Sequence, residues 1–344
     1  MQLLKHKLEV NEDGWDHEIP TTYFSQPYGF IDCMEWVYNV LINPPVNYCC
    51  YKKSDFNNTN INQIIPQIRI GFIGDIMKLN GVEFIISENI KSFFSDTDLL
   101  IGNFEGTILR DSCKPVFMGQ VHAESILEIL SGFFPPSRTV LSCANNHSGD
   151  YGWTGFCSSY QLIQDYGFIT IGRRDEPSIV IDGKVNIVSC TSWSNQKCNF
   201  VATIDEADRY FLDDAAFNIL YPHWGYEMQL NPKLRQVQQG RELLSKWDMV
   251  IGHHSHCPQP IVLHENNLRQ KLMAYSLGNF CNNKAIQGRQ IGIILKVELG
   301  PDQSGAWAAG RVQWEFISIS PLNDRSVELS ISFRQGLPIN GQFI

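Results

Sequence analysis

Residues 68–75 read Ile68-Arg69-Ile70-Gly71-Phe72-Ile73-Gly74-Asp75, a short apolar run that ends in a glycine and a carboxylate. A run of this length, rich in β-branched and aromatic residues and closed by glycine, predicts a buried β-strand over Ile68–Ile73. Asp75 then lies where the chain leaves the sheet. Polar residues follow other predicted strands in the same way, and this recurrence guides the rest of the interpretation.

Outward from this strand, the pattern alternates between strands and helices and later consists mainly of strands. Helical apolar spacing is found at Val82–Phe94, His122–Phe134, about Thr154–Asp165 and Pro232–Trp247. Strands are predicted at Asp98–Ile101, Thr139–Cys143, Phe168–Ile171, Val185–Ser189, Phe217–Tyr221, Met249–Ile251, Leu272–Tyr275, Ile291–Val297, Val312–Ile319 and Val327–Phe333. Alternation followed by successive strands argues for an α/β domain with a mixed or double sheet.

The segment before this domain has a different character. It is rich in aromatic residues without a clean period, and it ends in the polar run Lys52–Gln63, which is typical of a linker or long loop. We therefore expect residues 1–66 to form an accessory segment packed on a main domain of residues 67–344.

Composition excludes some partners. Of the 344 residues, 43% are hydrophobic and 18% are charged, which is typical of a globular protein with a substantial core. The formal charge of −9 gives no basic footprint for nucleic acid and no polybasic attraction to a membrane. An anionic substrate remains compatible with this charge, because a metal site would supply local positive charge.

The sequence contains no segment that is typical of export or membrane insertion. Residues 1–14 are charged and lack the apolar core of a signal peptide, and the apolar stretch 29–46 is interrupted by charges and by Pro44-Pro45. None of the ten cysteines forms a C-x-x-C pair, which leaves zinc-ribbon and thioredoxin interpretations without support. We expect a cytoplasmic protein with reduced thiols, although a leader can be missing from a sequence.

The polar residues that could carry chemistry share one position: each lies at or just beyond the end of an apolar strand. They are Asp75, Glu105, Asn146-His147, His223 and the pair His254 and His256. In open α/β sheets the carboxyl ends of strands face the ligand crevice. Carboxylates, an amide and imidazoles converging there form an oxygen and nitrogen ligand set for one or two divalent metals.

Each of these residues also has a simpler explanation. Asp75 could be a helix N-cap, Glu105 a solvated loop carboxylate, and His223 a core histidine. Asn145-Asn146 is common turn chemistry, because asparagine tolerates left-handed conformations. The cluster at 253–256 is harder to explain in this way, since several imidazoles at one strand end are costly to desolvate unless they bind something.

The motifs together resemble the CapA-type branch of the calcineurin-like metallophosphoesterases, the capsule and poly-γ-glutamate family. The matching segments occur in the family's order from about residue 68 to 282: Gly74-Asp75-Ile76-Met77, Asn103-Phe104-Glu105-Gly106, Ala144-Asn145-Asn146-His147, His223-Trp224-Gly225 with Glu227, Gly252-His253-His254-Ser255-His256, and Tyr275-Ser276-Leu277-Gly278-Asn279-Phe280.

The resemblance implies a two-sheet β-sandwich flanked by helices (α/β/β/α) with a dinuclear centre at the strand ends. Asp75 and His256 would bind the first metal, Glu105 would stand in for the bridging carboxylate, and the second metal would be bound by Asn146, His223 and His254. His147 would protonate the leaving group. Asn103, Asn145, Glu227, His253 and Asn279 would lie around these ligands or near the substrate.

The chain departs from the family in two ways. Members of the branch are often membrane-anchored and located outside the cytoplasm, whereas this sequence shows no anchor. Phosphoesterases of the superfamily have Asp-x-His at the first motif, whereas this chain has Asp75-Ile76-Met77, so the first metal has lost an imidazole. Asn103, Glu227 or Asn279 could compensate, or the centre holds one metal; manganese, iron or zinc would suit it. His253 is expected to point away or to support the ligands from outside, because adjacent residues in an extended segment face opposite sides.

Three functions follow from this pattern. The first is hydrolysis of a phosphate ester by a metal-activated hydroxide, with His147 as the general acid. The second is hydrolysis of an amide bond, such as a γ-glutamyl bond, by the same site. The third is an accessory role in polymer assembly without catalysis. The substrate of either enzyme would be an anionic small molecule or polymer, and the oligomeric state stays open.

Overall fold

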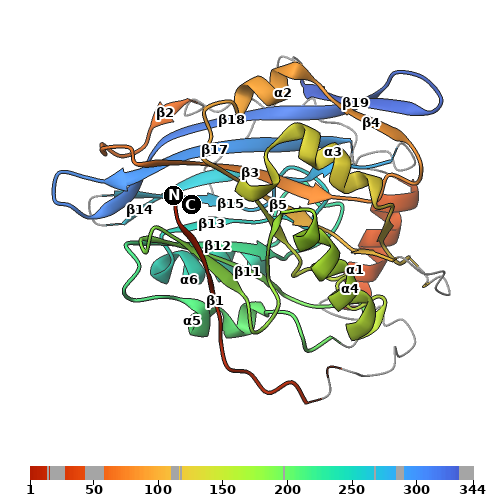
Figure 1. Cartoon of the computed structure of the whole chain (residues 1–344), viewed down its shortest axis with the longest axis horizontal. Helices are drawn as coiled ribbons and strands as arrows, with labels where there is room; N and C mark the ends of the chain where they lie inside the picture. The colour runs from red at the N-terminus through yellow and green to blue at the C-terminus, as the bar shows by residue number, and fades with distance from the viewer. Residues whose placement is uncertain are drawn as a thin grey trace.

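The 68–75 stretch lies in β3 (Ile68–Ile76), at the centre of one of two stacked β-sheets (Figure 1). The structure is a computed structural model. It describes residues 1–13, 15, 28–42, 58–109, 116, 118–196, 198–266, 269–283 and 290–332. Among these residues, no helix combines the length and the apolar character needed to span a bilayer. The cysteines at positions 33, 143, 157, 190, 198 and 281 are free thiols.

The sheet that contains β3 has ten strands. Along its main path these are β4 (Glu83–Ile86), β19 (Ser326–Ile331), β18 (Trp307–Pro321), β17 (Ile291–Pro301), β3, β5 (Leu99–Phe104), β8 (Thr139–Ser142) and β9 (Ile169–Ile171). Two short strands pair beside it, β16 (Asn279–Cys281) with β3 and β2 (Thr59–Asn60) with β18. Strands β3, β5, β8 and β9 are parallel, so their carboxyl ends share one edge.

The second sheet has seven strands. Their order is β1 (Leu3–His6), β10 (Ser178–Ile181), β11 (Val185–Thr191), β12 (Phe217–His223), β13 (Met249–Ile251), β15 (Arg269–Ala274) and β14 (Ile261–Asn266). The central strands β11, β12, β13 and β15 run parallel. A separate two-stranded sheet joins β6 (Thr107–Ile108) to β7 (Val121–His122).

Helices cover both outer faces, as Figure 1 shows. The ten-stranded sheet is covered by α2 (Glu88–Phe93), α3 (Ser125–Phe133) and α4 (Gly152–Asp165), and the seven-stranded sheet by α5 (Ala207–Tyr210) and α6 (Leu234–Lys246). The remaining helical segments are α1 (Phe30–Val37), η1 (Tyr38–Ile42), η3 (Pro136–Arg138) and η4 (Ile204–Glu206). The predicted α/β/β/α architecture is confirmed.

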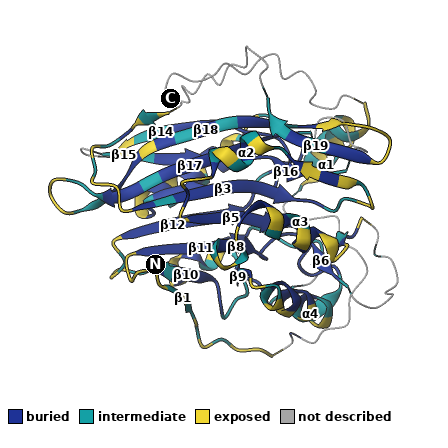
Figure 2. Ribbon diagram, turned by 45° about the horizontal axis from the view of Figure 1, so that its top comes forward, coloured by how far each residue is buried: buried dark blue, intermediate teal, exposed yellow. Residues whose placement is uncertain are grey.

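Both faces of the central strands are buried, which explains why they are apolar almost without interruption. On β3, Ile70 and Phe72 pack into the core between the sheets, whereas Ile73 belongs to the core under α2, α3 and α4. Figure 2 shows β3, β5, β12 and β17 as buried along most of their length, with exposed residues on α2 and α3.

One predicted element is wrong in part. The predicted helix Val82–Phe94 is instead β4 followed by the short helix α2. On β4, Phe84 and Ile86 are buried while Glu83 and Ile85 are exposed, and the strand pairs in parallel with β19. Pairing with a strand more than two hundred residues away overrides the local helical spacing. The predicted strand Val327–Phe333 corresponds to β19, and Phe333 lies outside the described residues.

The N-terminal segment contributes to both sheets. Strand β1 is an edge strand that pairs antiparallel with β10, and β2 pairs with β18. Helix α1 contacts the chain that follows β12, where Trp36 Nε1 donates to Glu227 Oε2 at 2.9 Å. Residues 52–57 of the predicted linker Lys52–Gln63 lie outside the described residues.

Candidate metal centre

The polar residues singled out in the sequence come together where the two sheets meet. Strands β3, β5 and β8 of the ten-stranded sheet bring Asp75, Glu105 and Asn146 to their carboxyl ends. Strands β12 and β13 of the other sheet bring His223 and the 253–256 segment. Each predicted ligand is at most 1% exposed. Burial of so many polar groups requires that they bind one another or a ligand.

One group of donors surrounds Asp75 Oδ1. This oxygen lies 3.3 Å from His253 Nδ1 and 3.9 Å from His223 Nδ1. The Nδ1 atoms of His223 and His253 are 2.8 Å apart, and His223 Nε2 lies 2.8 Å from Asn146 Oδ1. Asp75, His223 and His253 therefore form a compact set that could hold a metal ion.

A second group lies on the other side of the same carboxylate. Asp75 Oδ2 is 3.3 Å from His256 Nδ1, and His256 Nε2 is 3.7 Å from Glu105 Oε1. Asn279 Oδ1 lies 3.0 Å from His256 Nδ1. Asp75, Glu105 and His256 thus form a second candidate metal group, which shares Asp75 with the first.

His253 lies toward the cluster, so the first of its two expected orientations, pointing away, is wrong. The second, support of the ligands from outside, stays a prediction. The next residue, His254, has a φ of +102°, so the chain at this point is not extended and the alternation of side chains is lost. His253 instead approaches Asp75, whereas His254 donates its backbone N–H to Asp75 Oδ2 at 3.0 Å.

The supporting residues hold the ligands in place. Asn103 Nδ2 donates to Asp75 Oδ1 at 2.8 Å and lies 3.2 Å from His223 Nδ1. Asn145 Nδ2 donates to the carbonyl of Phe104 at 2.9 Å, which ties the ends of β5 and β8 together. Glu227 lies at the rim, with Oε2 at 4.0 Å from His256 Nε2.

The electrostatics favour the protonation states that bind metals. Burial alone would raise the pKa of Asp75, but hydrogen bonds from His253 and His256 hold it well below its usual value. Burial lowers the pKa of His223 well below its ordinary value and that of His254 to about 3. An ionised carboxylate beside neutral imidazoles is the state in which these side chains ligate a metal.

The donors fit a transition metal by their spacing and by their unmet hydrogen-bond capacity. Ligand atoms around a tetrahedral ion with bonds of about 2.0–2.1 Å are separated by roughly 3.3 Å, close to the spacing of Asp75 from His253 and His256. His253 Nε2 and His254 Nδ1 are buried and have no hydrogen-bond partner among the described residues.

His147 lies beside the ligands. Its Nδ1 is 2.7 Å from Asp150 Oδ2, and its Nε2 is 3.7 Å from Glu105 Oε1. Asn145 Oδ1 accepts the backbone N–H of His147 at 3.1 Å, and Asn195 Nδ2 lies 3.2 Å from its Nδ1. The sequence prediction omitted Asp150 and Asn195. The three-residue spacing from His147 could have indicated Asp150, but no local signal indicated Asn195.

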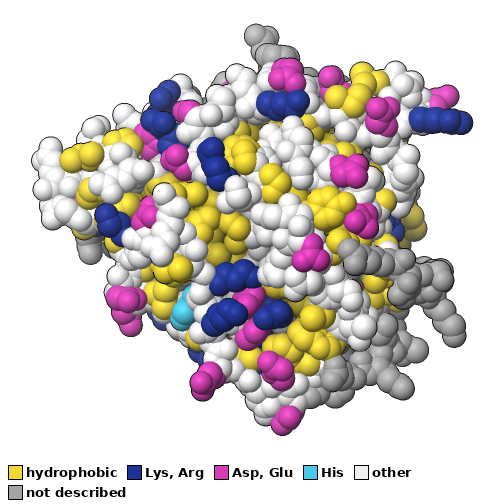
Figure 3. Space-filling model, in the orientation of Figure 1, with side chains coloured by type: hydrophobic (Ala, Val, Ile, Leu, Met, Phe, Trp, Pro, Cys, Tyr) yellow, Lys and Arg dark blue, Asp and Glu magenta, His cyan; other side chains and the backbone are white. Residues whose placement is uncertain are grey.

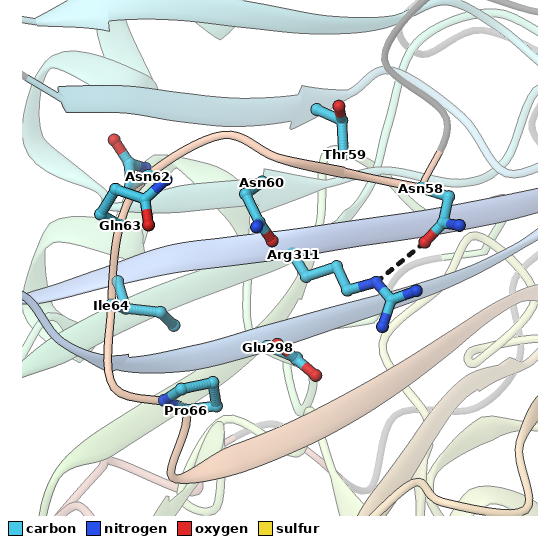
Figure 4. Close-up of a pocket in the computed structure, with 9 residues that line it drawn as sticks. All are labelled: Asn58, Thr59, Asn60, Asn62, Gln63, Ile64, Pro66, Glu298 and Arg311. Atoms are coloured by element: carbon cyan, nitrogen blue, oxygen red, sulfur yellow. Dashed lines mark hydrogen bonds between the residues drawn. The ribbon is translucent and has the colours of Figure 1, made fainter.

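The described surface contains other features that lie apart from this centre. A hollow of about 560 Å³ next to β2 is lined by residues that include Asn62 and Arg311, and Arg311 Nε donates to Asn58 Oδ1 at 2.8 Å (Figure 4). The hollow adjoins the amino end of β3, which is separated from Asp75 by roughly 20 Å along the strand. On the face in Figure 3, acidic and basic side chains are interspersed without a broad basic area.

Two stacked sheets with helices on both outer faces, and a buried carboxylate and imidazole cluster at the strand ends, define a protein of the metallophosphoesterase-like class. The family model described as "Bacterial capsule synthesis protein PGA_cap" matches residues 69–284. The chain belongs to this family.

Two curated relatives support the assignment. The PGA biosynthesis protein CapA of Bacillus subtilis (strain 168) is 25% identical over 244 residues, which cover 61% of this chain and 62% of the relative. The capsule biosynthesis protein CapA of Bacillus anthracis is 23% identical over 248 residues, with 62% and 59% covered. The match thus spans about three fifths of the length of these relatives.

Solved structures show weaker likeness. A hypothetical protein from Thermus thermophilus aligns with a TM-score of 0.42 and 12% identity, covering 72% of this chain and 98% of that one. A putative 5'-nucleotidase from Staphylococcus aureus, in complex with alpha-ketoglutarate, aligns with a TM-score of 0.41 and 14% identity, covering 72% and 54%. Family membership and the buried donor groups support a metal-dependent hydrolase or an accessory protein of the same architecture.

Proposed function

We propose that this protein is a metal-dependent hydrolase of a phosphate ester. The observation that carries the proposal is the convergence of two donor groups on one carboxylate, Asp75, with His147 and Asp150 beside them. A site that served only to stabilise the fold would need the ligands but not a histidine held next to them by a carboxylate of its own.

In this proposal the chain holds one or two ions of manganese, iron or zinc. One ion would lie at Asp75, His223 and His253, with Asn146 and His254 as further ligands beside His223. The other would lie at Asp75, Glu105 and His256, so that Asp75 would serve both sites. When bound, such ions polarise a phosphoryl oxygen and lower the pKa of water toward neutrality.

The residues of the chain itself orient the substrate and move a proton. With both ring nitrogens of His147 protonated, Nδ1–H donates to Asp150 and Nε2–H lies toward the ligand cluster. Nε2 then gives its proton to the oxygen of the leaving group, and His147 becomes a neutral imidazole. Burial of the whole cluster excludes bulk water, so these polar contacts act at low dielectric. An anionic substrate, small or polymeric, is attracted by the metal rather than by the surface of the protein.

Removal and replacement of the metal tests the proposal. The protein is stripped with a chelator, its metal content is verified, and hydrolysis of nitrophenyl phosphate and bis(nitrophenyl) phosphate is measured. Activity should vanish, return with manganese, iron, zinc or cobalt, and return poorly with calcium, which prefers shells made only of oxygen. Activity that survives complete metal removal would refute the proposal.

Two other functions remain candidates with an observation of their own. The relatives are named for PGA and capsule biosynthesis, which favours an amide or γ-glutamyl bond as the target. Hydrolysis of a γ-glutamyl nitroanilide, without hydrolysis of either nitrophenyl phosphate, would support this function. Buried Met77 in place of an imidazole favours an accessory role, which metal binding without turnover of any of these substrates would support.

A further inference from the structure

We propose that Tyr28 is a positioning residue that fixes His254 in the orientation and tautomer needed to bind a metal. Tyr28 belongs to the N-terminal segment and lies outside residues 69–284, which match the family model. The inference rests on the metal centre of the proposed function and adds to it a support that the family's matched region does not contain.

The contacts of the Tyr28 hydroxyl are direct. Its Oη lies 3.2 Å from His254 Nε2 and accepts the backbone N–H of Glu227 at 2.8 Å. A phenol oxygen has two lone pairs and one proton. One lone pair is used by the Glu227 amide, so the hydroxyl can either accept from His254 Nε2 or donate to it.

The two arrangements have opposite consequences for the metal. If Tyr28 accepts from Nε2–H, Nδ1 of His254 carries the lone pair; if Tyr28 donates, Nδ1 carries the proton and cannot bind a cation. His254 Nδ1 is buried with no hydrogen-bond partner among the described residues, as an atom reserved for a metal would be. Histidine ligands of metals commonly donate their other ring N–H to a protein oxygen, which sets the tautomer and the ring orientation.

Tyr28 is held firmly enough to act in this way. Its ring packs 5.4 Å from Trp193 and 5.3 Å from Tyr226, centroid to centroid, and Trp193 also packs 5.5 Å from His254. The helix that follows, α1, is anchored by Trp36 to Glu227 and by Asp32 to Lys233.

Metal binding and the docking of α1 are therefore linked. Docking presents the Tyr28 oxygen that selects the metal-binding tautomer of His254, and a bound metal favours the tautomer that donates to Tyr28. By linkage each event must strengthen the other by the same factor. The N-terminal segment would thus adjust the metal affinity of a site whose ligands all lie in the family-matched region.

Removal of one oxygen atom tests the inference. Tyr28→Phe keeps the ring contacts and removes the acceptor, and Tyr226→Phe makes the same change in the neighbouring ring. Zinc affinity, measured by competition with a chromophoric chelator, should fall about 10–100-fold in Tyr28→Phe, the usual effect of losing such a partner. Tyr226→Phe should bind zinc as the wild type does, and the melting temperature of the metal-free proteins should show that both variants are folded.

A second measurement does not depend on a variant. Nitrogen-15 spectra of the imidazoles in the zinc-loaded wild type should show His254 bound through Nδ1 with a proton on Nε2. Zinc bound through Nε2, or a Tyr28→Phe variant with wild-type affinity, would overturn the inference while leaving the proposed function intact. A wild type that binds no transition metal would instead remove the proposed function itself.

Discussion

His254 and His256 hold backbone conformations that L-residues seldom adopt, with φ values of +102° and +56°. Such residues cost of order 1–3 kcal/mol each and persist where the surrounding structure fixes them. Here the backbone of His254 is fixed by Asp75 and its ring lies against Tyr28. Because the backbone is not extended at His254, a rule based on alternating side chains could not have predicted that His253 lies toward Asp75.

At the same scale, His147 is expected to affect turnover and not metal content. His147→Gln should lower turnover on phosphate esters of poor leaving groups by roughly 10²–10⁴-fold, the usual effect of losing a positioned general acid. The loss should shrink for nitrophenyl esters, whose leaving group needs no proton. Metal analysis and steady-state kinetics on both substrate types check this.

His256→Gln is the matched control, because it should remove metal together with activity. If His147→Gln stripped the metal instead, His147 would be a ligand. An unchanged turnover on every active substrate would favour the accessory role.

Elements were predicted best where local sequence and tertiary pairing agree. The apolar runs that became β3, β12 and β17 are buried on both faces, so their composition alone indicated strands. The prediction for residues 82–94 was wrong in part because β4 pairs with β19, which lies far along the chain and gives no local signal. The contacts of α1 with the site were missed for a similar reason, since neither Tyr28 nor Trp36 carries a local signal of its partner.

Strand β1 provides a test of how the N-terminal segment is attached. Glu176 Oε2 lies 2.7 Å from Lys5 Nζ on β1, and Arg173 and Lys7 are also near. Burial would raise the pKa of Glu176, but Lys5 and then Arg173 lower it to about 2. Since the folded pKa lies below the unfolded value near 4.5, this contribution to stability is full above about pH 4.5 and is lost as pH falls toward 2.

Glu176→Gln should therefore lower the free energy of unfolding by about 3 kcal/mol at pH 7, and by much less at pH 3. Urea unfolding of both proteins at the two pH values measures this difference. Asp182→Asn, an exposed carboxylate that contacts Gln2 at the start of the chain, should change stability by less than about 0.5 kcal/mol at either pH. If Glu176→Gln lowered the free energy of unfolding equally at pH 7 and pH 3, the ionised carboxylate of Glu176 would not be the source of the stability.

For the whole molecule, the order of motifs predicted the architecture, and the place of the metal site stays a prediction. The ends of strands from both sheets converge because the parallel strands of each sheet end at the same edge. The sequence could not predict how the two donor groups are connected to each other. Asp75 takes part in both donor groups, and that sharing depends on backbone geometry at Gly278 and His254, which no spacing in the sequence specifies.

Because the ligands come from both sheets, a metal should stabilise the fold as a whole. A ligand that binds only the folded state adds about 4 kcal/mol at a free concentration 1,000 times its Kd, which amounts to several degrees in Tm for a protein of this size. Thermal unfolding of stripped protein with zinc or manganese should show this rise. Calcium is the control and should give a much smaller rise; an equal rise with calcium would indicate a site of oxygen ligands.

The interleaving of the chain between the two sheets also has a consequence for biosynthesis. Asp75 lies on β3, whose neighbours include β16 and β17, and its histidine partners begin at His223. A nascent chain on the ribosome presents Asp75 and Glu105 long before any imidazole of the second sheet has been synthesised. Neither candidate donor group is complete until synthesis has passed His253 and His256, so an ion that binds at this centre would have to enter late in translation or after it.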